Sequence, residues 1–414
     1  MFAMRGTVVV VLALWVTSCG GEDNPAGSSA TGGSAGSGGS AAMGGAGGQA
    51  GSGAGGQVGG AGGQVGGAGG QVGGAGGSAA AGAVFPGASW TKKTPADVGL
   101  DATALDALSK SIGGRGVIVR GGHLAYSWGD IAKRGDVASA AKPLYSYFLF
   151  RAVQQKKLGS IDDLVVSVVP GLATLNPSLG NKDAKIAWRH LATQTSCYGV
   201  SEAPGSAFDY NDFQMALFWD SLFLKVYGST LGTVDADTMK VGLCDAIGCE
   251  DQPTFLAFGA GDRAGRVAIS PRDFARFAWL FRNDGTWNGN ALVPAAVAKT
   301  ITESPLPNSI PRTKAVKANM LPGQRSIGST QIPDDQSDHF GSYSFLWWTN
   351  GADKSGQLNW KDAPKDTVLA SGHWGKRVAV FIKSLDLVAS WNDTNVDSQA
   401  ALNAALAKLA QSVK

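Results

Sequence analysis

The chain has 414 residues, of which 44% are hydrophobic and 16% are charged, and its formal net charge is +3. A charge this small and this scattered does not favour nucleic-acid binding, and the length is ample for a large hydrophobic core. The four histidines lie far apart, and neither an H-E-x-x-H nor a C-x-x-C motif occurs, so we expect no metal site and no cofactor.

Residues 1–19 have the pattern of an export signal. Arg5 precedes the apolar run Val8–Val16, which is too short to span a bilayer, and small residues follow it. The end of the signal, Val16-Thr17-Ser18-Cys19, resembles a bacterial lipobox, which predicts a lipid on Cys19 that anchors the protein in the cell envelope. We suspect the outer membrane. The alternative is an ordinary secretion signal in which the cysteine occurs by chance.

Residues 20–82 consist mainly of Gly, Ala, Ser and Gln, with GGQVGGA as a recurring unit and neither Lys nor Arg. So little apolar side chain cannot offset the backbone entropy that glycine loses on folding. This composition predicts a flexible tether. Residues 83–414 remain for one folded domain.

The sequence of this domain predicts strands near both of its ends and helices in its middle. A hairpin (116–120 and 123–128) is followed by a helix that ends near Lys156–Gly159, then by apolar helices over 212–227 and 270–281. After long loops over 303–340 come three strands (367–370, 378–382 and 387–391) and a closing helix (396–408). The pattern predicts an α+β fold, in which an antiparallel sheet is closed by both ends of the chain and the middle forms a mainly helical lobe.

Three cysteines fall in this domain, at positions 197, 244 and 249. Export would permit a disulfide. Cys244 and Cys249 are the closest pair, but the sequence does not exclude Cys197 as a partner of either, and three buried thiols are a further alternative.

Ser139 and Lys142 stand three residues apart where an apolar helix begins. Residues at this spacing share one helix face. A serine hydroxyl needs a base to take its proton, and both burial and a helix N-terminus disfavour the charged form of lysine. Lys142 is therefore a plausible base for Ser139, although a cap and a surface lysine would show the same spacing.

Two later segments add possible partners. PGSAFDYND (204–212) places Tyr210 before an apolar helix, and ASGHWGKRVAV (370–380) places His373-Trp374-Gly375 between two strands. Serine-x-x-lysine, tyrosine and H-x-G in this order resemble the penicillin-binding protein and class C β-lactamase superfamily of serine hydrolases. The segments GVIVRGGHLAYSWGD and GRVAISPRDFARFAWLFRNDGTWNG are also similar to that family, and the resemblance covers roughly Pro95 to the C-terminus.

The resemblance implies a role for each matching residue. Ser139 would be the acylated nucleophile, Lys142 its base or proton relay, and Tyr210 the group that carries a proton to the leaving group. His373 would take the place of the family's third-motif lysine and donate to the substrate or to Tyr210.

Substrate-binding roles follow from the same resemblance. The backbone N–H groups of Ser139 and Lys376 would form an oxyanion hole, and Gly375 would let the substrate lie close to the strand. Trp374 is expected at the core or the rim; in the cleft it would favour an apolar or aromatic group.

The middle motif departs from the family's pattern. Asp212 stands where the family usually has Asn, and Asn211 precedes it. An ionised carboxylate only accepts hydrogen bonds and would hold Lys142 protonated. Either Asp212 turns away as a helix cap while Asn211 contacts the lysine, or protons are transferred by a route different from that of the family.

Three functions are therefore considered. A serine hydrolase acting on small ester, amide or peptide-like substrates is favoured, with an esterase or small-amide hydrolase ahead of a β-lactamase or D-Ala-D-Ala carboxypeptidase. His373, mostly neutral at pH 7, suits a substrate carboxylate less well than lysine does. The alternative from another class is a non-catalytic binding lipoprotein on the same fold.

Overall fold

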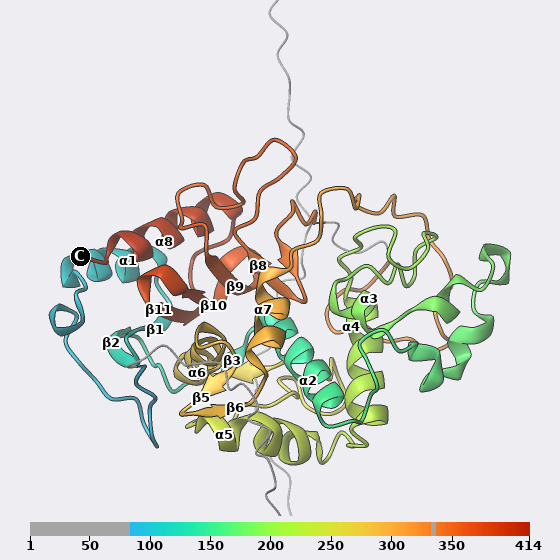
Figure 1. The fold of residues 1–414 in the computed structure, drawn as a ribbon, viewed down its shortest axis with the longest axis horizontal. Coiled ribbons are helices and arrows are strands. Elements are labelled where there is room, and N and C mark those ends of the chain that lie inside the picture. Colours follow the sequence, from blue (N-terminus) through green and yellow to red (C-terminus); the bar gives the residue numbers. More distant parts are fainter. Residues whose placement is uncertain (1–82, 333–336) are drawn as a thin grey trace, which may run out of the picture. The chain divides into compact units, whose positions relative to one another are not determined.

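The computed structural model describes residues 83–332 and 337–414 (Figure 1). The predicted export signal with Cys19 and the predicted tether lie outside these ranges. Within them, no helix combines the length and the apolar character that crossing a membrane requires.

A seven-stranded sheet forms the centre of the fold, in the order β2-β1-β11-β10-β9-β8-β7, and its neighbouring strands are all antiparallel. The strands are β1 (Arg115–Arg120), β2 (His123–Trp128), β7 (Tyr343–Ser344), β8 (Trp347–Thr349), β9 (Thr367–Gly372), β10 (Arg377–Ile382) and β11 (Leu387–Asn392). The first and last strands of the domain pair directly, because β1 lies beside β11. The predicted α+β sheet closed by both ends of the chain is confirmed.

Both faces of this sheet are covered (Figure 1). Along β10, Ala379 and Phe381 enter one core while Val378 and Val380 enter the other, as the period-two alternation of a strand requires. Helices α1 (Ala102–Ile112) and α8 (Gln399–Gln411) cover the second face, and α6 (Pro271–Arg282) and α2 (Lys142–Gln154) lie in the larger core on the first. The sheet is therefore a buried layer between two sets of helices.

The middle of the chain forms the expected helical lobe, seen beside the sheet in Figure 1. It contains α3 (Trp188–Ala192), α4 (Asp212–Trp219), which continues as a π-helix (Asp220–Val226), a second π-helix (Asp235–Cys244) and α5 (Asp245–Ile247). Two-stranded ladders join β3 (Gly135–Asp136) to β4 (Ala268–Ile269) and β5 (Thr286–Trp287) to β6 (Asn290–Ala291), and α7 (Ala295–Glu303) precedes the long loops.

Two helix starts differ from expectation, and a cap explains each. The closing helix begins at Gln399 and not at Val396, because the side chain of Ser398 accepts from the N–H of Ala401. Helix α1 was not expected; Asp101 caps it by accepting from two backbone N–H groups. Single polar residues thus fixed boundaries that apolar periodicity alone placed poorly.

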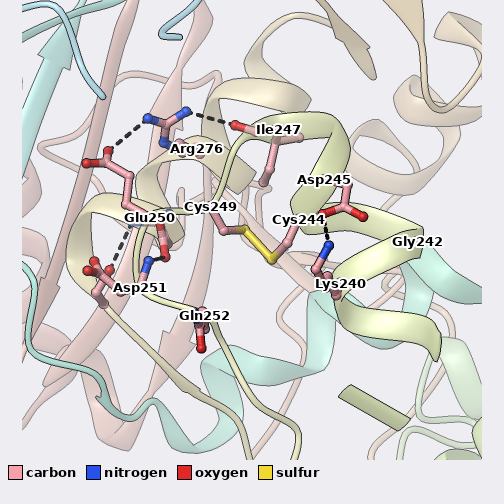
Figure 2. Close-up of a disulfide and its surroundings, with 12 residues drawn as sticks. Lys240, Gly242, Cys244, Asp245, Ile247, Cys249, Glu250, Asp251, Gln252 and Arg276 are labelled. Atoms are coloured by element: carbon pink, nitrogen blue, oxygen red, sulfur yellow. Dashed lines mark hydrogen bonds and ion pairs between the residues drawn. A yellow bond between two sulfur atoms is a disulfide. The ribbon is translucent and has the colours of Figure 1, made fainter. Parts of the chain in front are cut away.

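The segment 84–90, here called the N-terminal strap, is fastened to α6. Trp279 Nε1 donates to the Val84 carbonyl and Arg276 Nη1 to the Gly87 carbonyl, both at 3.1 Å. The same Arg276 guanidinium donates to Glu250 Oε1 and to the Ile247 carbonyl, at 2.8 Å each (Figure 2). Arg276 therefore joins the strap to the loop that follows α5.

A disulfide closes that loop. Cys244 and Cys249 are bonded (Figure 2), and Cys197 is a buried free thiol. The pair nearest in sequence is thus the bonded one, and the two alternatives, a bond to Cys197 and three free thiols, are wrong.

Replacing both Cys244 and Cys249 with Ala should lower the free energy of unfolding by about 2 kcal/mol, because a crosslink between residues only five apart closes a short loop in the unfolded chain. The urea midpoint of this double variant, compared with that of the oxidised protein, measures the loss. The reduced wild-type protein is the control and should behave like the double variant. Equal midpoints for oxidised and reduced protein would contradict the prediction.

Candidate active site

The candidate nucleophile lies on a tight turn before α2. Ser139 belongs to the 3-10 turn Ala138–Ala141; its three alanine neighbours are buried, whereas Ser139 is partly exposed. Ala138 has φ 49°, a left-handed conformation that side chains rarely adopt. Asp136 Oδ1 accepts from the Ala138 N–H at 3.1 Å and so holds the start of the turn. A strained turn that exposes one hydroxyl is typical of a functional position.

Lys142 lies directly beneath this serine and is almost fully buried. Its Nζ donates to Ser139 Oγ at 2.8 Å and to Asp212 Oδ1 at 2.9 Å, and it lies 4.6 Å from the centroid of the Tyr210 ring. The predicted nucleophile, base and proton carrier are thus brought together with Asp212 around one ammonium group.

Two opposing effects set the charge of Lys142. Burial, the largest single effect, would lower its pKa, but the carboxylate of Asp212 together with Tyr210 and Tyr343 outweighs burial and holds the pKa of Lys142 above its usual value. Lys142 is therefore a cation at neutral pH, paired with a carboxylate and hydrogen-bonded to the oxygen that it would have to deprotonate.

One of the two alternatives for the middle motif is wrong. Asn211 does not contact Lys142: its Oδ1 accepts from the Gln214 N–H at 2.8 Å as the cap of α4, and its Nδ2 donates to the Tyr198 carbonyl at 3.0 Å. Asp212, the next residue, accepts the hydrogen bond from Lys142. Asn caps a helix well, so Asn211 has a structural role and Asp212 lies in the position that faces the lysine.

Tyr210 is held by an aromatic cluster. Its ring centroid lies 6.1 Å from that of Tyr343 and 6.2 Å from that of Trp348. Burial raises the pKa of Tyr210, while the charge of Lys142 and hydrogen bonding to Ser139 oppose this rise. The hydroxyl is thus neutral near pH 7 and beside the serine, as a proton carrier to a leaving group requires.

The third motif lies at the end of β9 as two residues with unusual backbones. His373 has φ 47° and Trp374 has φ 61°. Trp374 is 54% exposed, so it does not lie in the core, which was one of the expected places. A Trp in this conformation is uncommon.

Two substrate-binding roles predicted in this segment do not fit the structure. The N–H of Lys376 donates to the His373 carbonyl at 3.2 Å, so it closes a turn and does not serve as an oxyanion donor. A Cβ on Gly375 would come within 2.8 Å of Leu402 and 2.9 Å of Val396, so this glycine faces α8 and the core behind the sheet.

The glycine that faces the nucleophile is Gly372. A Cβ there would lie 2.4 Å from the Val137 carbonyl oxygen and 3.2 Å from the Ala140 nitrogen. Only glycine allows β9 to approach the Ser139 turn this closely. The sequence carried a signal for it, a glycine at the end of a strand directly before His373.

Three further charged residues surround the site and were not expected. Asp136 pairs with Arg266, whose Nε lies 2.9 Å from Oδ1, and with Arg377, whose Nη1 lies 3.3 Å from Oδ2. Arg377 Nη1 also lies 2.9 Å from His373 Nδ1. Asp136 thus connects the nucleophile turn to the third motif. These residues come from three distant parts of the chain, and no spacing in the sequence relates them.

The described ranges contain no group of three or more His, Cys, Asp or Glu residues arranged to hold a metal ion. Two cavities of about 260 and 280 Å³ lie away from Ser139, one beside the Asp220–Arg325 ion pair and one beside Tyr227. Neither is lined by Ser139, Lys142, Tyr210 or His373.

No family model and no curated protein matches the chain, whereas solved structures do. A candidate 6-aminohexanoate-dimer hydrolase from Bacillus anthracis has a TM-score of 0.51 and 14% identity over 80% of this chain and 86% of its own. A penicillin-binding protein homologue from Caulobacter crescentus also has a TM-score of 0.51 and 14% identity, over 75% of this chain and 96% of its own. These likenesses confirm the predicted fold, that of the β-lactamases and transpeptidases.

Proposed function

We propose that this protein is a serine hydrolase that forms an acyl-enzyme on Ser139 and hydrolyses ester or small-amide bonds. The observation that carries the proposal is the 2.8 Å contact between Ser139 Oγ, which is partly exposed, and the buried Nζ of Lys142. A lysine kept from water and in contact with a serine hydroxyl has a chemical use that a surface lysine does not. The fold shared with the solved hydrolase structures supports a hydrolase in general and no particular substrate.

The proposed reaction begins from the minor form in which Lys142 has lost its extra proton. Ser139 Oγ attacks the carbonyl carbon of the substrate while its proton passes to Lys142 Nζ. Tyr210 gives its hydroxyl proton to the leaving alcohol or amine as the old bond breaks, and regains one from Lys142. Water then hydrolyses the acyl-serine by the same groups in reverse.

We propose the backbone N–H groups of Ser139 and His373 as the oxyanion donors, in place of the pair that includes Lys376. Gly372 fixes the start of the third motif against the nucleophile turn, and His373 is the next residue. Oxyanion stabilisation requires donors already in position, which this close contact supports.

The proposed function is tested with a fluorophosphonate probe on the full-length chain, by intact mass and peptide mapping. We expect one adduct, on Ser139, which is absent in Ser139→Ala and at least about 100-fold slower in Lys142→Ala, since loss of a general base commonly costs this much. An ester, amide and β-lactam panel then separates an esterase or amidase from a β-lactamase or carboxypeptidase. No adduct on a folded protein would overturn the proposal.

A non-catalytic binding protein is the second candidate, and one observation favours it. Asp212 raises the pKa of Lys142, and a protonated lysine does not accept the serine proton. The probe experiment distinguishes the two, because a binding protein would leave Ser139 unlabelled at every pH.

A further inference from the structure

The contact between Arg377 and His373 fixes which ring nitrogen carries the proton. Arg377 Nη1 lies 2.9 Å from His373 Nδ1. A guanidinium has only donors, so in this contact Nδ1 must be the acceptor. An imidazole that accepts at Nδ1 is neutral and carries its proton on Nε2.

The position of Arg377 is itself determined by a carboxylate. Asp136 Oδ2 lies 3.3 Å from Arg377 Nη1, and the Asp136 and Arg377 side chains are only 12% and 16% exposed. Asp136 also pairs with Arg266, whose side chain is 9% exposed, and accepts from the Ala138 N–H in the nucleophile turn. Asp136, which is bound to the nucleophile turn, therefore fixes the Arg377 guanidinium next to Nδ1 of His373.

We infer that Arg377 is a positioning residue that fixes His373 as the neutral Nε2–H tautomer, so that the imidazole meets a substrate as a hydrogen-bond donor and not as a base or a charge. The use of this donor toward a substrate rests on the proposed function; the tautomer itself does not.

The charges around His373 agree with this inference. Desolvation and the positive charges of Arg377, Arg266 and Lys376 lower the pKa of His373 to about 4, and only Asp136 opposes them. Protonation at Nδ1 would place a cation against a guanidinium. His373 should therefore keep its single proton from about pH 5 upwards and contribute no titration near neutrality.

A neutral donor also bears on the class of substrate. The Nε2–H of His373 can bond to a carbonyl, hydroxyl or ether oxygen without bringing charge, whereas a carboxylate is bound best by a cation. Of the substrates considered, neutral esters and amides therefore match this position best.

The test reads the tautomer directly, by two-dimensional ¹H–¹⁵N correlation of the imidazole nitrogens in full-length protein labelled with ¹⁵N-histidine, over pH 4–9. His373→Gln assigns the signal among the four histidines. We expect the Nε2–H pattern in wild type, unchanged above about pH 5. In Arg377→Met we expect a mixture of tautomers and a pKa raised by at least about one unit, toward the ordinary value near 6.5.

Two further variants separate the hydrogen bond from charge and from folding. Lys376→Gln removes a neighbouring positive charge without removing the bond, so it should keep the Nε2–H pattern. Arg377→Lys keeps a donor and should restore that pattern, and it serves if Arg377→Met does not fold. An Nδ1–H pattern in wild type, titration of His373 near 6.5 in wild type, or an unchanged pattern in Arg377→Met would each overturn the inference.

Failure of this inference can be distinguished from failure of the proposed function. An unlabelled Ser139 with a fixed Nε2–H tautomer overturns the hydrolase and leaves the positioning role intact. A labelled Ser139 with a mixed tautomer does the reverse.

Discussion

Replacing Asp212 with Asn should speed the labelling of Ser139 by a fluorophosphonate at neutral pH. The carboxylate of Asp212 holds the pKa of Lys142 above its usual value. Asn removes that attraction, and the burial of Lys142 then lowers the pKa. The neutral, base-competent fraction at pH 7 rises about tenfold for every unit by which the pKa falls.

The wild-type pH dependence follows from the same pair. Neutral lysine accumulates only as the pH rises toward a raised pKa, so the labelling rate should climb about tenfold per pH unit across neutrality. In Asp212→Asn the same climb should occur at lower pH and end in a plateau. Rates measured from pH 5 to 10 check both expectations.

Asp220→Asn is the matched control, because that carboxylate lies on the same continuous helix but pairs with Arg325. It should leave the pH profile where the wild type has it. If Asp212→Asn instead slows labelling at every pH while the protein stays folded, Asp212 takes part in accepting the proton and the present account of Lys142 is wrong.

Replacing Gly372 with Ala should reduce the labelling rate of Ser139 by about 100-fold, the cost of displacing reacting groups by roughly 1 Å. The added Cβ would lie 2.4 Å from the Val137 carbonyl oxygen, which is closer than Cβ atoms in real proteins approach other heavy atoms. Either the nucleophile turn or the end of β9 must move, and both carry groups of the site.

The expected loss in this variant is one of rate and not of folding. Gly261→Ala is the control, because a Cβ there meets nothing within 4 Å. Thermal unfolding should show the Gly372 variant to be folded at the temperature of the assay. A Gly372→Ala protein that labels as fast as the control would show that β9 does not need this close approach.

The sequence predicted the elements better than the contacts between them. The apolar runs of β9, β10 and β11 are local features of the chain, and the sequence predicted all three strands. The contact between Ser139 and Lys142 is also local, since three residues along a turn bring the side chains together. Chain order and the family resemblance then related Tyr210 and His373 to this pair.

The sequence could not predict contacts between residues that lie far apart along the chain. Asp136, Arg266 and Arg377 meet only after three separate segments pack together. The exchange of roles between Asn211 and Asp212 is a difference of one residue in the start of α4, and boundaries of elements are the least predictable quantity. The roles of Gly375 and Lys376 were assigned from the family resemblance, and the tight turn after His373 gives both of them other partners.

The N-terminal strap has a mechanical consequence. A pull on the chain at Val84 would pass through the hydrogen bonds of Trp279 and Arg276 into α6, and through Arg276 into the loop that the Cys244–Cys249 bond closes. Helix α6 packs on β10, β11 and β1. These hydrogen bonds involve neither the nucleophile turn nor the third motif, so tension on the strap would act first on α6 and on the loop that the disulfide closes.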